Sequence, residues 1–295
     1  PEPFCALIDP DLHEFVGRFR FSAGQPEVNL AVSYDAAADL VTAKGTIAGE
    51  HFTCGGVRIG QFDTFMIYSN QVLDLKPLHI VRDDEKFEGS VRVDFVRSLG
   101  FFSATNSFPP ADIARVLAPE EHTVLEDIRF AGPVYAAGHG QLDYEHWTNH
   151  NFKGIFQAEN IGMGKVQASL FIADVQGLGS QLIFTNVSAQ LYGGQASGSG
   201  KFDIHLEDGS APYRISAAIN RLDLEQLLRQ VSSGDYDRIR GQLSAALNLT
   251  ADAKTGFWKS VRGGGKVEIK DGRLADVPLF GGFSRLTQSA FPGFS

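Results

Sequence analysis

The stretch LYGGQASGSGKFDI (residues 191–204) decides the fold of this chain, because it can be read as a nucleotide loop or as part of a sheet. A P-loop requires the spacing G-x-x-x-x-G-K-[ST] between a strand and a helix. Gln195 stands where the first glycine is needed, and Phe202 follows Lys201 where a serine or threonine would hold magnesium. After Lys201, apolar and polar residues alternate, which predicts a strand with one apolar face and excludes a bound nucleotide.

The same stretch belongs to an internal repeat. When the sequence is shifted by 109 residues, ten of the 52 positions in residues 44–95 match without a gap. Gly198-Ser199 falls on Gly89-Ser90, and the Tyr-Gly-Gly at residues 192–194 falls on the Asp-Asp-Glu at residues 83–85. Both trios have the composition of a hairpin turn. The pair Arg20-Phe21 recurs as Arg129-Phe130 and again, with isoleucine, at residues 238–239.

Short helical segments precede each copy of the repeat. They are DPDLHEFV (residues 9–16), PPADIARVL (109–117) and RLDLEQLLRQV (221–231), and each carries an aspartate suited to a helix start. The sequence therefore predicts three units, at residues 9–109, 110–220 and 221–295, of which the last is cut short. Together they form one repeat-built domain fragment.

Alternating runs predict the strands within each unit. In the first unit they lie near residues 18–22, 27–35, 40–49, 56–69 and 71–95, the last being a hairpin. In the third unit, GQLSAALNLTAD and GKVEIKDGRL show the same period of two, with a turn expected at Asp271-Gly272 and a helical segment after it. Consecutive short strands pair antiparallel, and helices this few cannot cover about fifteen strands. We therefore expect a mainly β fold, an elongated, curled antiparallel sheet that forms a repeating β-groove, with short helices linking the repeats.

Charge and composition exclude some classes of function. The net charge is −9 with scattered Lys and Arg, which argues against nucleic acid as a partner. No apolar run is long enough to span a bilayer and no signal peptide is present. The chain starts at Pro1 and stops at Ser295 just after an apparently helical segment, so we expect a piece of a longer protein. Cys5 and Cys54 either form one disulfide or serve as two small buried apolar groups, and the second interpretation is favoured.

Candidate catalytic groups have simpler structural interpretations. The segment GHGQLDYEHWTNHNF holds His139, His146 and His150 near Asp143 and Glu145. It does not read as a helix that would align two histidines for a metal, and Asn149-His150-Asn151 reads as a turn, so a solvated hairpin is expected. The carboxylates at residues 83–85 are expected to form a turn rather than an acid–base pair. The sequence thus predicts no catalytic residue, no metal site and no cofactor.

The ordered segments after residue 150 resemble the C-terminal region of AsmA-like proteins. These are LIFTNVSAQLYGGQASGSGKFDI, NRLDLEQLLRQV, IRGQLSAALNLTA and RGGGKVEIKDGRLADVPLFGG, within about residues 150–290. The repeat is also similar to bridge-like lipid transfer proteins built of repeating β-grooves. The resemblance implies a periplasmic module, anchored to the inner membrane by segments outside this fragment, that takes part in phospholipid transport to the outer membrane and outer-membrane assembly.

Physical chemistry supports an acyl lipid as the partner. A lipid with two chains of about 16 carbons loses on the order of 25 kcal/mol on entering water, so a carrier must replace that apolar contact. The residues expected to face the groove are Leu73, Leu75, Val91, Val93, Phe95, Leu182, Phe184, Phe202, Ile204, Leu247, Leu249, Val267 and Ile269. The favoured hypothesis is a non-enzymatic lipid-binding module.

Two alternatives remain open on the sequence alone. The first is a structural or adhesive β-repeat protein whose sheet faces pack on each other in a closed core without lipid. The second is a hydrolase that uses the carboxylates or histidines, with His146 and Asp84 as its test residues.

Overall fold

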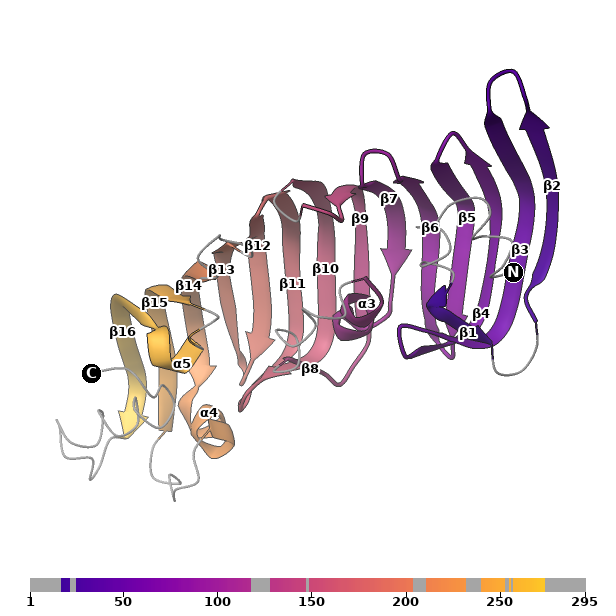
Figure 1. Ribbon diagram of the computed structural model, residues 1–295. Coiled ribbons are helices and arrows are strands. Elements are labelled where there is room, and N and C mark those ends of the chain that lie inside the picture. The colour runs from indigo at the N-terminus through magenta and orange to yellow at the C-terminus, as the bar shows by residue number, and fades with distance from the viewer. Residues whose placement is uncertain are drawn as a thin grey trace. The chain divides into compact units, whose positions relative to one another are not determined.

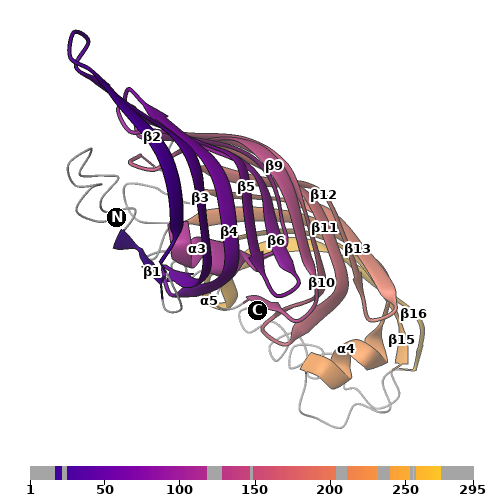
Figure 2. The same ribbon diagram turned by 90° about the vertical axis from the view of Figure 1, so that its right-hand side faces the viewer.

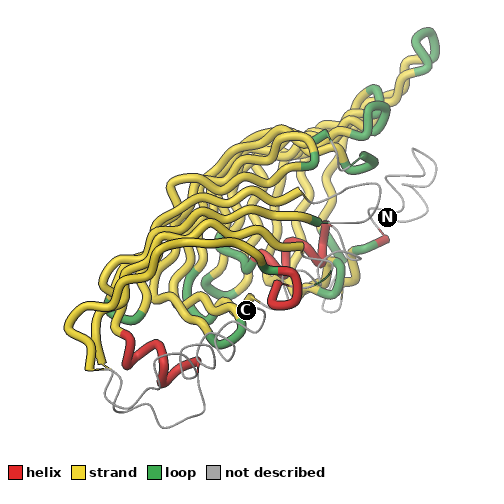
Figure 3. Tube along the Cα trace, turned by 90° about the vertical axis from the view of Figure 1, so that its left-hand side faces the viewer, coloured by secondary structure: helices red, strands yellow, loops and turns green. Residues whose placement is uncertain are grey.

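A computed structural model describes residues 17–21, 25–117, 128–146, 149–203, 211–231, 240–252, 255 and 257–273 (Figure 1). The described strands form one antiparallel sheet of 16 strands that is not closed. The strand order is β1-β3-β4-β5-β6-β7-β9-β10-β11-β12-β13-β14-β15-β16, with β2 beside β3 and β8 beside β10. Helices in the described residues are few and short (Figure 3). The predicted mainly β, antiparallel class with short helices is confirmed.

The chain divides into two compact units. Unit 1 comprises Pro1–Glu126 and Val134–Gly154, and unit 2 comprises Asp127–Pro133 and Ile155–Ser295. These bounds differ from those of the sequence repeat, and the division into three repeat units stays a prediction. In unit 1 the elements are β1 (Phe19–Phe21), β2 (Glu27–Asp35), β3 (Leu40–Cys54), β4 (Val57–Ser69), β5 (Val72–Arg82), β6 (Glu85–Asp94), β7 (Leu99–Asn106), α3 (Pro110–Leu117) and β9 (Val134–Asp143).

Strand β10 (His150–Met163) begins in unit 1 and continues into unit 2. The other elements of unit 2 are β8 (Ile128–Phe130), β11 (Val166–Gly179), β12 (Gln181–Leu191), β13 (Gly194–Asp203), β14 (Pro212–Asp223), α4 (Leu224–Val231), β15 (Arg240–Asp252), α5 (Phe257–Ser260) and β16 (Arg262–Arg273). The expected helices at residues 109–117 and 221–231 are α3 and α4. The expected helices at residues 9–16 and after residue 278 lie outside the described residues.

The backbone repeats at the interval found in the sequence. Strands β1, β5 and β6 have the same bounds as β8, β12 and β13 after a shift of 109 residues. Residues with positive φ recur at the same interval, in the pairs His51 and Asn160, Gly55 and Gly164, Asn70 and Gly179, and Asp83 and Tyr192. Since a positive φ marks a turn or a local distortion of a strand, the bends of the chain repeat together with its strands.

One of these distortions keeps the apolar side chains of long strands on a single face. In β3, Gly49 and Phe52 are both buried while the two residues between them are exposed, and His51 has a φ of 52°. The paired strand β4 shows the same change of alternation, between Ile59 and Phe62. With strict alternation, the apolar side chains of residues 52–54 and 57–59 would point to the polar face of the sheet. The local change keeps them on the apolar face while both strands curve (Figure 2).

Three local predictions were wrong. Strand β7 was not expected, because its Phe101-Phe102 pair blurs the period of two. His150 does not lie in a turn but opens β10, and it is 4% exposed. The expected turn at Asp271-Gly272 is instead a register shift within β16, since the pairing with β15 shifts between Gln242 and Arg240.

Candidate functional site: the apolar face of the sheet

The register of β12 to β16 places a single class of residue on one face of unit 2. Residues directly opposite each other in an antiparallel pair point to the same side of the sheet. The chain of pairs that starts at Leu182–Phe202 and Phe184–Gly200 passes through Tyr213 and Ile215 of β14 into β15 and β16. The face so defined comprises Leu182, Phe184, Val187, Ala189, Leu191, Gly194, Ala196, Gly198, Gly200, Phe202, Tyr213, Ile215, Ala217, Ile219, Leu222, Leu243, Ala245, Leu247, Leu249, Ala251, Gly263, Gly265, Val267 and Ile269.

No charged residue occurs among these described positions of β12 to β16. The only hydroxyl is that of Tyr213, which is 7% exposed and whose ring stacks on Phe202 with ring centroids 5.1 Å apart. Burial, with a contribution from Asp252, raises the pKa of Tyr213 to about 12, so the phenol is neutral at physiological pH. The face therefore offers apolar contact and very little hydrogen bonding.

Glycine and alanine keep part of this face low. A Cβ built on Gly198 would lie 2.2 Å from the carbonyl oxygen of Ser216 in the neighbouring strand. Its repeat equivalent, Gly89 in unit 1, meets the carbonyl oxygen of Ser103 at 2.3 Å. The neighbouring backbone thus leaves no room for a side chain at these two glycines. On β13 the apolar face consists of Gly194, Ala196, Gly198 and Gly200, followed by the large side chain of Phe202.

Unit 1 carries an equivalent face with its own cluster of apolar residues. Ala43, Met66, Tyr68 and Leu73 are buried, and the partly buried residues packed against them are Leu30, Ile47, Leu75, Val93 and Phe95. Every member comes from β2 to β6 or from Phe95 directly after β6. The cluster is thus formed by the sheet alone, and its outer members keep part of their apolar surface accessible.

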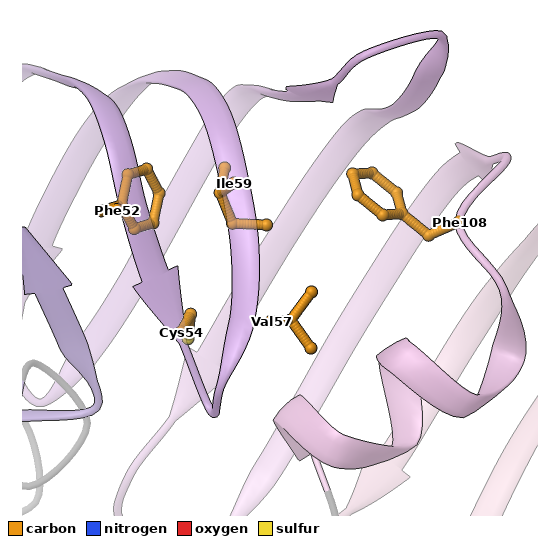
Figure 4. Close-up of a cluster of buried hydrophobic side chains, with 5 residues drawn as sticks. All are labelled: Phe52, Cys54, Val57, Ile59 and Phe108. Carbon is orange, nitrogen blue, oxygen red and sulfur yellow. The ribbon is translucent and has the colours of Figure 1, made fainter. Parts of the chain in front are cut away.

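A second cluster in unit 1 is covered by a helix. Phe52, Cys54, Val57, Ile59 and Phe108 project toward one another between β3, β4 and the segment that leads into α3 (Figure 4). Ile113 and Val116 of α3 pack against this cluster, as do the aromatic rings of β1. Cys54 is a free, buried thiol, and burial raises its pKa. The part of the apolar face of unit 1 next to the β3–β4 turn is therefore covered by the protein itself.

Arg82 fastens α3 to the sheet. Its guanidinium donates to Asp112 of α3 at 2.6 Å and also pairs with Glu85 across the β5–β6 turn. The same group lies 5.0 Å from the centroid of the Phe108 ring. Burial acts to lower the pKa of Arg82, but the hydrogen bonds to Asp112 and Glu85 outweigh it and raise the pKa.

The opposite face of the sheet is mainly polar. Ser216 and Asn248 share a hydrogen bond of 2.8 Å there, and Asn186 donates to Asp174 at 2.6 Å. In unit 1, His79 and Asp63 lie 2.9 Å apart on this face. Some large apolar residues, such as Phe65 and Ile155, are also exposed on it, at 39% and 47%. Phe65 and Ile67 are neighbours on this face of β4, and the residues paired with them are Thr46, Lys44 and Asp74, so polar side chains still surround them.

The residues predicted to line a groove share this apolar face within their units. In unit 1, register pairs Leu73 with Val93 and Leu75 with Val91, and Phe95 packs against the same cluster. In unit 2 the face includes Leu182, Phe184, Phe202, Leu247, Leu249, Val267 and Ile269. Ile204 lies outside the described residues. Their contact with a lipid stays a prediction.

Sequence reasoning missed several members of the face. Tyr213, Ile215 and Ile219 alternate in β14, and that alternation would have identified them. Phe102, which register places opposite Val91, belongs to the unexpected strand β7. For β14 the signal was present in the local sequence, whereas for Phe102 it was the pairing of β7 with β6, which depends on neighbouring strands.

The polar residues singled out in the sequence do not come together as a catalytic centre. Asp83 and Asp84 form the β5–β6 turn, as expected, beside an open pocket of about 540 Å³ that Arg58, Arg82, Asp112 and Arg115 also line. The carboxylates of Glu85 and Asp112 there are paired with Arg82. The arrangement is an ion-pair network that holds a helix.

The histidine segment is a hairpin, and its groups are separated. His146 has a 69% exposed side chain, whereas His150 is buried and its Nδ1 accepts a hydrogen bond from the backbone N–H of Asp143. The Asp143 carboxylate accepts hydrogen bonds from the backbone of His146 and Glu145, and these bonds lower its pKa against the opposing effect of burial. This aspartate therefore stabilises the turn.

No group of three or more metal-binding side chains occurs in the described part of the chain. Among the same residues, no helix is both long and apolar enough to cross a bilayer. Comparison with protein-family models, with curated proteins and with solved structures gives no match.

Proposed function

We propose that the apolar faces of the two units bind the acyl chains of lipids, and that the protein is a non-enzymatic lipid-binding module. The observation that carries the proposal is the composition of the face from β12 to β16, where every described position is glycine, alanine, aliphatic or aromatic. An apolar face of this extent in water requires a cover.

The free energy that an acyl chain gains on leaving water favours its binding to such a surface. A chain of about 16 carbons gains about 12 kcal/mol on leaving water, at ~0.8 kcal/mol per methylene. A face that displays few hydrogen-bonding groups makes that exchange without leaving polar groups unpaired. Head groups then remain in water beyond the strand ends.

The resemblance to AsmA-like proteins suggests where in the cell this lipid binding takes place. Under the proposal the module holds phospholipid in the periplasm, as part of transport between the inner and outer membranes and of outer-membrane assembly. Its anchor to the inner membrane would lie in segments outside residues 1–295.

A structural or adhesive protein with a closed core is the alternative. That alternative needs a second layer over the apolar face, and the described strands form a single sheet. The two ideas differ in whether lipid accompanies the purified protein.

Lipid extraction and mass spectrometry of the purified chain test the proposal, with a matched pair of variants on β15. Leu247→Asp places a charge on the apolar face, and Asn248→Asp places the same charge on the opposite face of the same strand. We expect Leu247→Asp to weaken binding of a fluorescent fatty acid at least tenfold, about 1.4 kcal/mol, and Asn248→Asp to leave it unchanged.

A photocrosslinking residue provides a second readout that does not depend on destabilising the fold. Benzoylphenylalanine at position 202 is expected to crosslink to lipid, and the same residue at position 201, on the opposite face, is not. Wild-type protein that carries no acyl lipid and binds none would overturn the proposal and favour the structural alternative.

A further inference from the structure

Two strand edges of the described sheet have only one partner each. Among the described strands, β2 pairs only with β3, and β16 pairs only with β15. Strand β2 keeps an unbroken register with β3 over nine residues, and all of its residues except Leu30 are exposed. A long, regular edge presents a row of backbone donors and acceptors that another strand can pair with.

The charges of the two edges are opposite. Strand β2 carries only acidic charge, at Glu27 and Asp35. Strand β16 carries two arginines and two lysines against Glu268 and Asp271. Pairing of β2 with β2 brings acidic residues together, and pairing of β16 with β16 joins two strands of net positive charge, whereas pairing of β2 with β16 joins strands of opposite net charge.

The two faces of the sheet limit the register of such a pair. On β2 the apolar face carries Val28, Leu30, Val32 and Tyr34, which lie opposite inward residues of β3. On β16 it carries Gly263, Gly265, Val267 and Ile269. If the apolar faces are to coincide, an antiparallel pair can shift only in steps of two residues.

One of these registers matches side chains along the whole of β2. It places Glu27 opposite Lys270 and Asp35 opposite Arg262 on the polar face. On the apolar face it places Leu30 opposite Val267, which brings two apolar side chains together. It also sets the 61% exposed ring of Tyr34 over Gly263, an aromatic–glycine pairing that shields a bare backbone.

We propose that β16 of one copy of this chain pairs antiparallel with β2 of a second copy in this register. The two surfaces differ, so the contact is heterologous and each copy keeps one free edge of each kind. Such contacts build open chains of copies rather than closed dimers. The proposal does not depend on lipid binding.

Disulfide trapping tests the register directly in the full chain with Cys5→Ser and Cys54→Ala. One protein carries Ala31→Cys, and a second carries Lys266→Cys, which lies directly opposite in the proposed register. The control partner carries Gly264→Cys, two residues out of register, where a Cβ meets no atom within 4 Å. Residues directly opposite are close enough for a disulfide, and diagonal ones are not.

We expect mild oxidation to join the 31 and 266 variants much faster than the 31 and 264 variants. Analytical ultracentrifugation of the wild-type protein is expected to show masses that grow with concentration beyond a dimer. Glu27→Lys and Lys270→Glu are each expected to weaken this association about threefold, and the double variant to restore it. A monomer at every concentration, equal crosslinking of both pairs, or a closed dimer joined through two 31 positions would overturn the proposal.

Discussion

Tyr213 carries the one hydroxyl on the apolar face of the described strands β12 to β16. The ring stacks on Phe202 and is buried with Ala251 and Val261, while burial and Asp252 raise the pKa of its phenol. The residue is kept neutral by its surroundings. It therefore contributes packing to the face without bringing charge to it.

The raised pKa of Tyr213 gives a pH dependence with a definite sign. The phenol has a pKa of about 12 in the folded protein and about 10 in the unfolded chain, so its contribution to stability is complete below pH 10. We expect that contribution to be lost as pH rises from about 10 to about 12. Urea unfolding over this range should show a shallower fall in stability for Tyr213→Phe than for wild type.

Tyr34→Phe is the matched control for this titration, because Tyr34 is 61% exposed at the sheet edge. A pH profile of Tyr213→Phe equal to that of Tyr34→Phe would contradict the assignment. The comparison separates one buried phenol from general alkaline effects.

At the scale of elements, α3 is held to unit 1 by an apolar cluster and by one arginine of the sheet. It packs over the cluster around Phe52 and is fastened through Arg82, while Gly55 in the β3–β4 turn lies close to the backbone at Arg115. Cys54 belongs to the cluster on which α3 packs. The reactivity of this thiol therefore reports whether α3 is in place.

We expect Arg82→Met to increase the labelling rate of Cys54 by a maleimide at least tenfold. The substitution removes the charge that pairs with Asp112 and Glu85 and ends the link between the sheet and α3, and breaking a part-buried ion pair is destabilising, although Asp112 keeps its pair with Arg115. Peptide-resolved mass spectrometry distinguishes Cys54 from Cys5. The control is Arg58→Met, at an exposed position beside the same pocket. Equal labelling rates in the two variants would show that Arg82 does not hold the helix.

Elements with a strong local pattern were predictable, and those that depend on partners were not. The alternation in β2 and the helical segments of α3 and α4 were identified from the sequence because side-chain periodicity alone defines them. Strand β7 and the start of β10 were missed, since a Phe-Phe pair and an Asn-His-Asn sequence acquire strand structure only from the strands beside them.

At the scale of the whole molecule, the repeat places equivalent glycines in two compact units. Gly89 and Gly198 are 109 residues apart, and a Cβ added to either would collide with a carbonyl oxygen of the next strand. In repeat proteins, each structural element is stabilised mainly by its neighbours along the chain. A local defect should therefore have a local effect on stability.

Gly89→Val and Gly198→Val form a matched pair of such defects. Each is expected to cost about 1–3 kcal/mol through overpacking. Hydrogen exchange should rise around β5 to β7 in the first variant and around β12 to β14 in the second. The controls Ser90→Val and Ser199→Val place the same side chain on the other face of the same strands. Faster exchange throughout both units in either glycine variant would show that the whole sheet unfolds as one.

The nearly uniform chemistry of the face from β12 to β16 also bears on how this protein can change over time. A surface that requires only apolar side chains of suitable volume accepts exchanges among valine, leucine, isoleucine and phenylalanine. Positions such as Gly198, where the neighbouring backbone leaves no room for a side chain, must stay glycine. Its sequence is free to drift while the surface stays the same. Selection then acts on the alternation of apolar and polar residues along the strands and on the small residues of the face, rather than on any individual large side chain.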